Sequence, residues 1–286
     1  MDITVFGGTG TVGSALVDIL RTEGANVRVV TRFAEKADRF GDGVAGFVAD
    51  MDQPETLVPA LKNVDGVFLL AANSPQETQQ SLSALWPIVD AKPKRLIYMS
   101  SLLSTLAPLV PHAGVKIGVE AAIRTSGIDY TTLRPSYFAQ NDLILKDALM
   151  GGVYPVPFGH THVARVDTRD VARAAATALL EGKGRNQSIT VSSPDQPNGE
   201  EAADLWSGAL ARPIAYPDMT PDAWANMAPP EMPKWLVFDL TVMYRYLGTQ
   251  GAAVTEADLE AQATLLPDGP RRYPDFVDEC ARAWRG

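Results

Sequence analysis

The sequence predicts an α/β protein built on a doubly wound parallel sheet, followed by a smaller α-rich lobe at the C-terminus. Short β-branched runs alternate with helical stretches from the first residues onward, which is the pattern of βαβ units. With 286 residues, of which 46% are hydrophobic, the chain can bury a large core.

Eight strands are expected in chain order, each a short apolar or β-branched run bounded by turn residues. The first five cover residues 3–7, 26–32, 46–50, 66–71 and 95–100, and three more cover 130–133, 163–166 and 189–191. Helices are expected between them. The first is marked by Val12, Ala15, Leu16, Ile19 and Leu20, which recur on one apolar helix face before Gly24 ends it. Others are expected over residues 53–61, 76–89, 115–125 and 170–180, with a loop over 151–162.

The composition changes near Ser193, where Pro194, Pro197, Asn198 and Gly199 follow one another closely. The tail beyond this break holds helical stretches punctuated by prolines. We therefore expect residues 1–193 to form the sheet domain and residues 194–286 to form the smaller lobe.

Charge and composition bear on the partners of the chain. A formal net charge of -9 and a pI near 4.9 disfavour polyphosphate backbones, so we expect no direct binding of nucleic acid. No run approaches the roughly 20 apolar residues that cross a bilayer, and no signal-peptide pattern follows Met1. The single cysteine, Cys280, cannot form an internal disulfide. We expect a cytoplasmic protein without membrane contact, and a homodimer remains open.

A glycine-rich turn follows the first expected strand. Gly7, Gly10 and Gly13 stand between a strand and an amphipathic helix, inside a βαβ unit, which is the context that a dinucleotide-binding turn requires. Glycines permit backbone angles closed to other residues and let a pyrophosphate approach the helix N-terminus. The alternative is a tight turn whose small residues serve packing alone. We favour a Rossmann-type nicotinamide-dinucleotide site contacted by Gly7, Thr9, Gly10, Thr11, Val12 and Gly13.

Arg32 ends the second expected strand, where NAD-binding proteins place an acid that bonds the ribose hydroxyls. An acid would repel a 2′-phosphate, whereas a guanidinium can bind it bidentately. Lys36 follows four residues later. Both cations have an alternative interpretation as solvated surface residues. We favour NADP(H) as the cofactor, with NAD(H) as the other candidate.

Other strand ends are expected to line the same crevice, because ligands of doubly wound sheets bind at the carboxyl ends of the strands. Asp50 and Met51 close the third strand, where Asp50 could accept a hydrogen bond from adenine or instead cap the next helix. Ala71, Ala72 and Asn73 close the fourth strand with small side chains that leave room for a cofactor.

The candidate catalytic residues follow the fifth strand, which ends in Ser100. His112, Lys116 and Glu120 are spaced i, i+4 and i+8, so their side chains can share one helix face. A lysine here could bond the nicotinamide ribose, and a histidine suits proton transfer near neutral pH. The alternative is a surface Lys–Glu pair beside a capping histidine. Tyr98 is expected in the core.

Two further groups of residues have a possible role in a site. His160 and His162 alternate in sequence, but no third ligand lies nearby, so we expect no metal site. The C-terminal tail is rich in aromatic and sulfur side chains, which could line an apolar substrate pocket or simply form the core of the lobe. They are Trp224, Met227, Met232, Trp235, Phe238, Met243 and Tyr244.

These motifs resemble the NmrA-like branch of the atypical short-chain dehydrogenases/reductases. The resemblance rests on Gly7 to Gly13, Val29 to Arg32, Ser100-Ser101-Leu102, the His112, Lys116 and Glu120 set, Ser126 to Asn141 and Val166 to Ala172. Beyond about Ser193 it is one of length and texture only. The resemblance implies an NADP(H)-preferring Rossmann domain with a small C-terminal lobe.

In classical members a tyrosine four residues before the lysine donates the proton, and here His112 takes its place. The resemblance therefore leaves three candidate donors: His112, Tyr137 or water. The family includes reductases of quinones, azo dyes and other unsaturated compounds, and also non-catalytic redox sensors. We favour an NADPH-dependent reductase that transfers hydride to a small, apolar, conjugated acceptor bound between the two lobes. The alternative is an NADP(H) sensor that acts through a protein partner.

Overall fold

Seven parallel strands form the central sheet of the computed structural model, which describes residues 1–38, 40–41 and 43–285. Gly286, the last residue of the expected lobe, lies outside the described residues. The strand order is β3-β2-β1-β4-β5-β6-β9, so the chain reverses direction across the sheet between β1 and β4. The strands are β1 (Asp2–Phe6), β2 (Asn26–Thr31), β3 (Val44–Val48), β4 (Gly66–Leu69), β5 (Arg95–Met99), β6 (Tyr130–Pro135) and β9 (Gln187–Val191).

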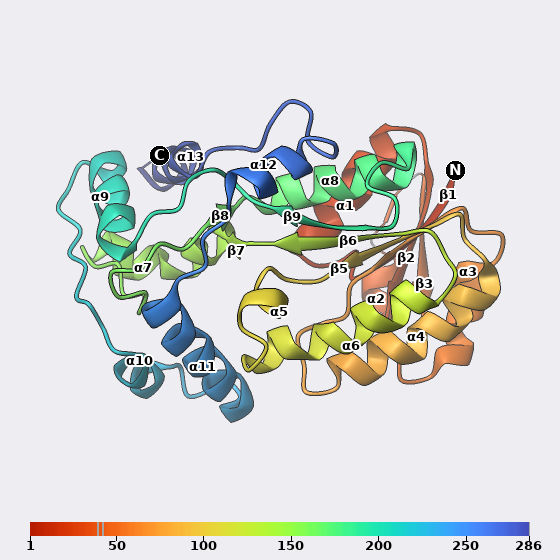
Figure 1. Cartoon of the computed structure of the whole chain (residues 1–286), viewed down its shortest axis with the longest axis horizontal. Coiled ribbons are helices and arrows are strands. Elements are labelled where there is room, and N and C mark those ends of the chain that lie inside the picture. The colour runs from red at the N-terminus through yellow and green to blue at the C-terminus, as the bar shows by residue number, and fades with distance from the viewer. Residues whose placement is uncertain (39, 42, 286) are drawn as a thin grey trace.

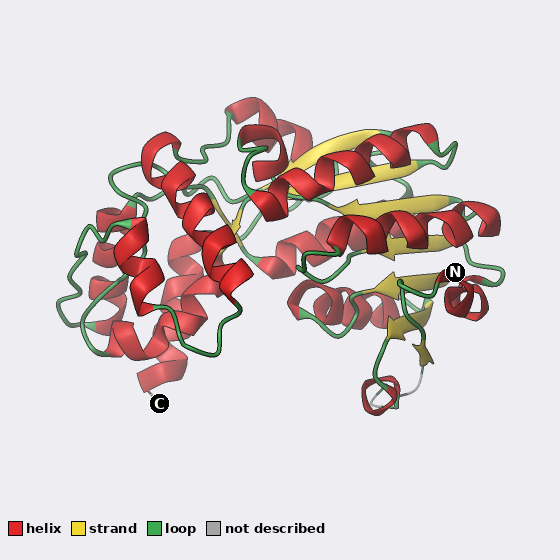
Figure 2. Ribbon diagram, turned by 90° about the horizontal axis from the view of Figure 1, so that it is seen from below, coloured by secondary structure: helices red, strands yellow, loops and turns green. Residues whose placement is uncertain are grey.

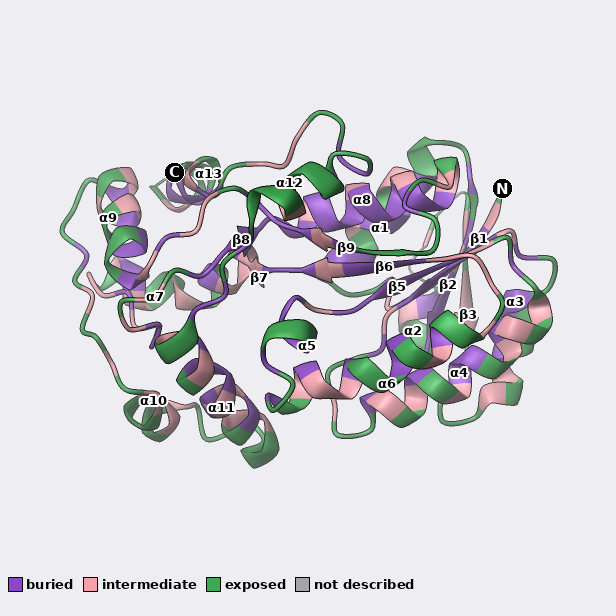
Figure 3. Ribbon diagram, in the orientation of Figure 1, coloured by how far each residue is buried: buried purple, intermediate pink, exposed green. Residues whose placement is uncertain are grey.

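Helices cover both faces of this sheet (Figure 1). On one face lie α1 (Thr11–Thr22) and α8 (Thr168–Glu181), whose apolar side chains share a core with the strands. On the other lie η1 (Pro54–Leu57), α3 (Val58–Leu61), α4 (Glu77–Ala91) and α6 (Pro111–Thr125). Strands β4 and β5 are buried along nearly their whole length, as expected of a parallel sheet covered on both sides. Figure 3 shows this burial for β5. This is the Rossmann architecture that the sequence predicts.

A second apolar core lies beyond the carboxyl ends of the strands (Figure 2). It is formed mainly by α9 (Gly199–Leu210), α11 (Lys234–Gln250) and α13 (Tyr273–Arg285), with α10 (Pro221–Met227) beside α11. Trp206 is fully buried there and stacks on Trp284 with ring centroids 5.0 Å apart. Earlier elements join it, namely α5 (Leu103–Leu106), η2 (Ala139–Leu145) and α7 (Lys146–Met150). The division after residue 193 stays a prediction.

The last part of the chain also returns to the sheet. Helix α12 (Glu256–Gln262) packs on β9, and its Gln262 side chain bonds both the N–H and the C=O of Ser192, each at 2.9 Å. Leu265 and Leu266 then enter the sheet core. The C-terminal segment therefore contributes residues to both apolar cores.

Several element bounds differ from those expected. Residues 53–61 form a 3₁₀ turn and one short α-turn, because Pro54 and Pro59 each remove a backbone donor. Helix α6 begins at Pro111 and not at residue 115, since proline suits the first helical position. The expected strand 163–166 is reduced to β8 (Arg165–Val166), which pairs with β7 (Tyr137–Phe138) outside the main sheet. Helix α2 (Ala34–Ala37) was not predicted.

In the described part of the chain, no helix combines the length and the apolar character that a bilayer span needs.

Candidate active site

The glycine turn forms a close backbone cradle at the start of α1. Gly7 has a φ of +74°, and a Cβ on Gly13 would lie 2.1 Å from the Gly7 carbonyl oxygen. The Gly10 N–H donates to that same carbonyl at 3.0 Å, which closes the turn. Gly10 caps α1 without a side chain, and no acidic residue stands in the first helical turn. The free N–H groups of this helix end suit an anion such as a pyrophosphate, so the cradle fits a dinucleotide.

Arg32 and Lys36 converge on the exposed ring of Phe33. The Arg32 Cζ lies 5.8 Å and the Lys36 Nζ 4.8 Å from the ring centroid. Phe33 follows the end of β2 and is 46% exposed. Both cations therefore lie beside Phe33, just beyond the carboxyl end of β2, where a 2′-phosphate could be bound.

The end of β3 differs in part from expectation. The Asp50 side chain accepts a hydrogen bond from the Asp52 N–H at 3.0 Å, so it forms a local turn. Its interpretation as a helix cap is wrong, because Gln53 is the capping residue of η1. Met51 packs against the core under α3 and α4. At the end of β4, Ala71 is buried and Ala72 is exposed.

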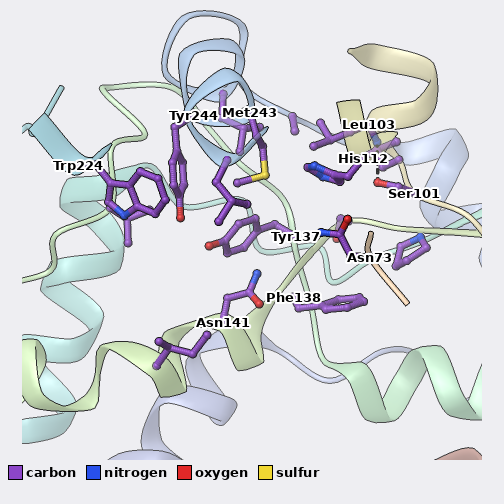
Figure 4. Close-up of a pocket in the computed structure, with 18 of the residues that line it drawn as sticks. Asn73, Ser101, Leu103, His112, Tyr137, Phe138, Asn141, Trp224, Met243 and Tyr244 are labelled. Carbon is purple, nitrogen blue, oxygen red and sulfur yellow. Dashed lines mark hydrogen bonds between the residues drawn. The ribbon is translucent and has the colours of Figure 1, made fainter. Parts of the chain in front are cut away.

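A cavity of about 570 Å³ opens between the sheet edge and the second core. Asn73, Ser100, His112, Lys116 and Tyr137 all line it, and because His112 and Lys116 share α6, residues from four separate segments meet there. Figure 4 shows Asn73, His112 and Tyr137 facing this space, with Met243 and Tyr244 on its far wall. Most of the remaining wall is apolar.

The aromatic and sulfur residues of the C-terminal tail divide between pocket and surface. Five of the seven line the cavity: Trp224, Met227, Met232, Met243 and Tyr244. Trp235 and Phe238 do not, and Phe238 is 63% exposed, so their assignment to the pocket is wrong. The core alternative also holds in part, because Met243 and Tyr244 belong to the second apolar core as well.

Lys116 forms an ion pair that spacing did not predict. Its Nζ bonds the Glu77 carboxylate on α4, and both side chains are at least 90% buried. The expected alternative of a surface pair with Glu120 is therefore wrong. An ammonium has three donors, so this pair leaves others for a ligand in the cavity.

His112 has a carboxylate partner of its own. Both carboxylate oxygens of Asp239 lie 3.0 Å from the His112 Nδ1, and one of them accepts the His112 backbone N–H at 3.1 Å. Asp239 belongs to α11 and is buried. The histidine is thus held from the second core while its ring lines the cavity.

Glu120 is the third polar residue on this face of α6, and it is not one of the residues that line the cavity. It accepts hydrogen bonds from Ser100, Ser104 and Arg134. Burial by itself would raise the pKa of Glu120, but the hydrogen bonds from Arg134 and Ser100 lower it overall. His112, Lys116 and Glu120 share one helix face as predicted, yet each binds a different partner.

Tyr137, the other candidate proton donor, lies in β7 against a buried guanidinium. The Arg165 Cζ is 5.2 Å from the Tyr137 ring centroid, and Phe158 packs edge-on to that ring at 5.2 Å. Burial and the negative charge of Asp142 raise the pKa of Tyr137, and Arg165 offsets this only in part. A raised pKa makes the phenol a weaker acid. Tyr98 is 1% exposed and lies in the core as expected.

The remaining histidines lie elsewhere. His162 Nδ1 is 2.8 Å from the Gln196 carbonyl oxygen, and His160 stands at the surface near Glu200. Within residues 1–38, 40–41 and 43–285, no group of three or more His, Cys, Asp or Glu side chains is placed to hold a metal ion.

A family model described as the NmrA-like family matches residues 1–277 of the chain. The chain belongs to the NmrA-like family. Among curated relatives, this NmrA-like protein is 31% identical to an NAD(P)H azoreductase of Xenophilus azovorans, over 76% of the chain and 77% of the relative. It is 28% identical to the prestalk A differentiation protein A of Dictyostelium discoideum, over 78% and 74%.

Solved structures share the fold of this NmrA-like protein. An NADPH-dependent quinone oxidoreductase of Escherichia coli, solved with NADPH, superposes with a TM-score of 0.88 at 21% identity, covering 97% of this chain and 99% of the other. A triphenylmethane reductase of Citrobacter sp., solved with NADP(H), gives 0.86 at 22% identity, covering 98% and 100%. Both confirm the Rossmann-type fold over nearly the whole chain.

Two residues of the site escaped the sequence analysis. Glu77 is the first residue of α4 and resembles an ordinary acidic helix start, which the helix dipole favours. Asp239 is flanked by Phe238 and Leu240 on an apolar helix, and a buried acid in such a run was the one available signal. Their partners stand 39 and 127 residues away in the sequence, beyond the reach of any local pattern.

Proposed function

We propose that this NmrA-like protein is an NADPH-dependent oxidoreductase of the atypical short-chain dehydrogenase/reductase type. Its substrate would be a small, apolar, conjugated acceptor such as a quinone, an azo compound or an enone. One observation carries the proposal: His112, Lys116 and Tyr137 share the wall of a largely apolar cavity at the carboxyl edge of the sheet. The azoreductase named among the relatives supports the same reaction class.

The residues of the sheet edge fit the proposed cofactor. Gly7, Thr9, Gly10, Thr11, Val12 and Gly13 would hold the pyrophosphate, and Arg32 with Lys36 the 2′-phosphate. Asp50 and Met51 would border the adenine, and Ala71, Ala72, Asn73 and Ser100 would leave a path toward the cavity. Lys116 would bond the nicotinamide ribose. When bound, NADPH supplies a hydride.

The chain itself contributes orientation, exclusion of water and a proton. The apolar wall, which includes Tyr244 and Met243, favours a planar apolar molecule over a charged one. The proton would come from the polar side of the cavity, where His112 is better suited than Tyr137 because burial weakens the phenol as an acid. A non-catalytic sensor would need neither an apolar acceptor pocket nor a proton donor, and for this reason we favour the enzyme.

The decisive experiment mixes purified protein and NADPH with a panel of quinones, azo dyes and enones and follows loss of cofactor absorbance. Turnover of at least one acceptor is expected. Tight NADPH binding without turnover of any acceptor would favour the non-catalytic sensor.

A matched pair of variants tests the cavity as the acceptor site. Ala228 lines it, whereas Ala223 is exposed on the neighbouring helix α10. Ala228→Trp should raise the KM for the acceptor by about tenfold because the indole fills the space, with NADPH affinity unchanged. Ala223→Trp should leave both constants near the wild-type values. Equal effects of the two variants on the KM would show that the acceptor binds outside this cavity.

A further inference from the structure

Asp239 and His112 form a dyad whose carboxylate is buried and whose imidazole is partly exposed to the cavity. Helix α6 packs on the sheet through Val119 and Ile123, whereas its first turn, which carries His112, reaches the second core at Ala113. Helix α11, which carries Asp239, belongs to that second core. Asp239 is 3% exposed, and both of its carboxylate oxygens lie 3.0 Å from the His112 Nδ1. In the described part of the chain, the His112 ring forms hydrogen bonds with Asp239 alone.

The dyad decides which ring nitrogen carries a hydrogen. A carboxylate only accepts, so the Nδ1 facing Asp239 must be the N–H of the neutral ring. The Nε2 is then left for the cavity that the His112 side chain lines. In the imidazolium form, the Nε2 bears the proton that can be transferred to a molecule in the cavity.

We propose that Asp239 is a positioning residue that holds His112 in the Nδ1–H tautomer, so that the His112 Nε2 delivers the proton to the acceptor. This proposal rests on the proposed reductase function. The acceptor gains a hydride with its two electrons from NADPH and a proton at its oxygen or nitrogen. The N–H bond at Nε2 breaks, a new O–H or N–H bond forms on the acceptor, and neutral His112 regains a proton from water. The sum is acceptor plus NADPH plus H⁺ giving reduced acceptor plus NADP⁺.

The charges around the cavity support this division of roles. Lys116 pairs with Glu77, whereas His112 faces Asp239, so each of these two side chains has its own buried carboxylate. Tyr137 is the remaining titratable candidate donor, and burial raises its pKa. Asp239 is therefore the carboxylate that orients the His112 ring.

A purely structural role for Asp239 predicts different results. Its carboxylate also accepts the backbone N–H of His112, the second residue of α6, and thereby caps that helix from another element. Loss of this cap alone would lower stability without changing the tautomer of the ring. The tautomer of the His112 ring must therefore be measured as well as the turnover rate.

The first measurement uses the wild-type protein without cofactor. The ¹⁵N chemical shifts of labelled histidine distinguish the two tautomers, and His112→Phe assigns the signal among the three histidines. An Nδ1–H signal for neutral His112 is expected. An Nε2–H signal would overturn the proposal without any variant at position 239 and independently of whether turnover is found.

The second measurement uses Asp239→Asn, with Asp222→Asn on α10 as the matched control. The amide oxygen can still cap α6, but the charge is lost, so kcat should fall about 10²-fold with little change in the KM for NADPH. In the double variant with His112→Phe, the loss should be no greater than in His112→Phe alone. Asp222, which is exposed and pairs with Arg245, should be replaceable without effect on kcat. Unchanged kcat in Asp239→Asn would overturn the proposal, whereas inactive wild type would instead refute the reductase function.

Discussion

Lys116 on helix α6 is joined to Glu77, the first residue of α4, by an ion pair that is at least 90% buried at both ends. The hydroxyl of Thr78 also donates to the Val115 carbonyl at 3.0 Å, so the two helices are bonded twice at this point. A buried carboxylate and ammonium depend on each other, because either alone would be a charge without a partner. The lysine proposed to orient the cofactor is thus also part of the framework.

Lys116→Ala should therefore lower both stability and turnover. Removing one member of a buried pair costs about 3–5 kcal/mol in the free energy of unfolding, which urea titration measures. The double variant Lys116→Met with Glu77→Gln should recover most of this stability, because no unpaired charge remains, yet it should not recover turnover. Recovery of turnover in the double variant would show that the Lys116 ammonium has no part in the reaction.

Arg32→Ala should weaken NADPH much more than NADH. A charge-assisted bond from a guanidinium to a phosphate contributes about 1.5–3 kcal/mol, which corresponds to roughly ten- to hundredfold in Kd. Calorimetric titration with both cofactors measures the ratio. Arg21→Ala is a suitable control, because Arg21 is an exposed residue on α1. Equal losses for NADPH and NADH would mean that Arg32 does not bind the 2′-phosphate.

Gly13→Ala and Gly118→Ala form a matched pair of helix substitutions. A Cβ on Gly13 would lie 2.1 Å from the Gly7 carbonyl oxygen, whereas nothing lies within 4 Å of a Cβ on Gly118. Gly13→Ala should abolish dinucleotide binding, because the turn must open. Gly118→Ala should stabilise the protein by about 0.5–1 kcal/mol, as glycine is a poor helix former. Intact NADPH binding in Gly13→Ala would contradict the proposed cradle.

Glu120 should make stability depend on pH. Its pKa is lower in the folded protein than the ordinary value of 4.5, because hydrogen bonds from Arg134 and Ser100 outweigh burial. Such a carboxylate stabilises the fold above pH 4.5, and this contribution disappears as the pH falls through the lower, folded value.

Glu120→Gln should accordingly cost about 2 kcal/mol near pH 7, and the difference from wild type should shrink below pH 4.5. Denaturant titration at several pH values provides the comparison. Glu181→Gln is the control, because the Glu181–Lys183 pair is exposed and should contribute less than about 1 kcal/mol. A difference that persists undiminished at low pH would show that the Glu120 charge is not its source.

The sheet edge was predictable because its signals are local. Gly7, Gly10 and Gly13 mark a strand–turn–helix junction, and Arg32 stands directly at the end of the next strand. Because neighbouring strands of the sheet are parallel, their order and register place these strand ends side by side. Two element bounds were set by proline and not by the apolar pattern. The segment from Pro54 forms a 3₁₀ turn where a helix was expected, and α6 begins earlier than expected, at Pro111.

The sequence by itself determined the fold class, the glycine-rich strand–turn–helix junction and the residues of α6 that face the cavity, because each depends on spacings of a few residues. Only the tertiary structure decided their partners: Glu77 for Lys116, Asp239 for His112 and Arg134 for Glu120. Buried charges require compensation wherever the fold can supply it, and which acid meets which base depends on how distant helices pack. The Lys116–Glu77 pair therefore could not be read from the spacing that suggested Lys116 and Glu120.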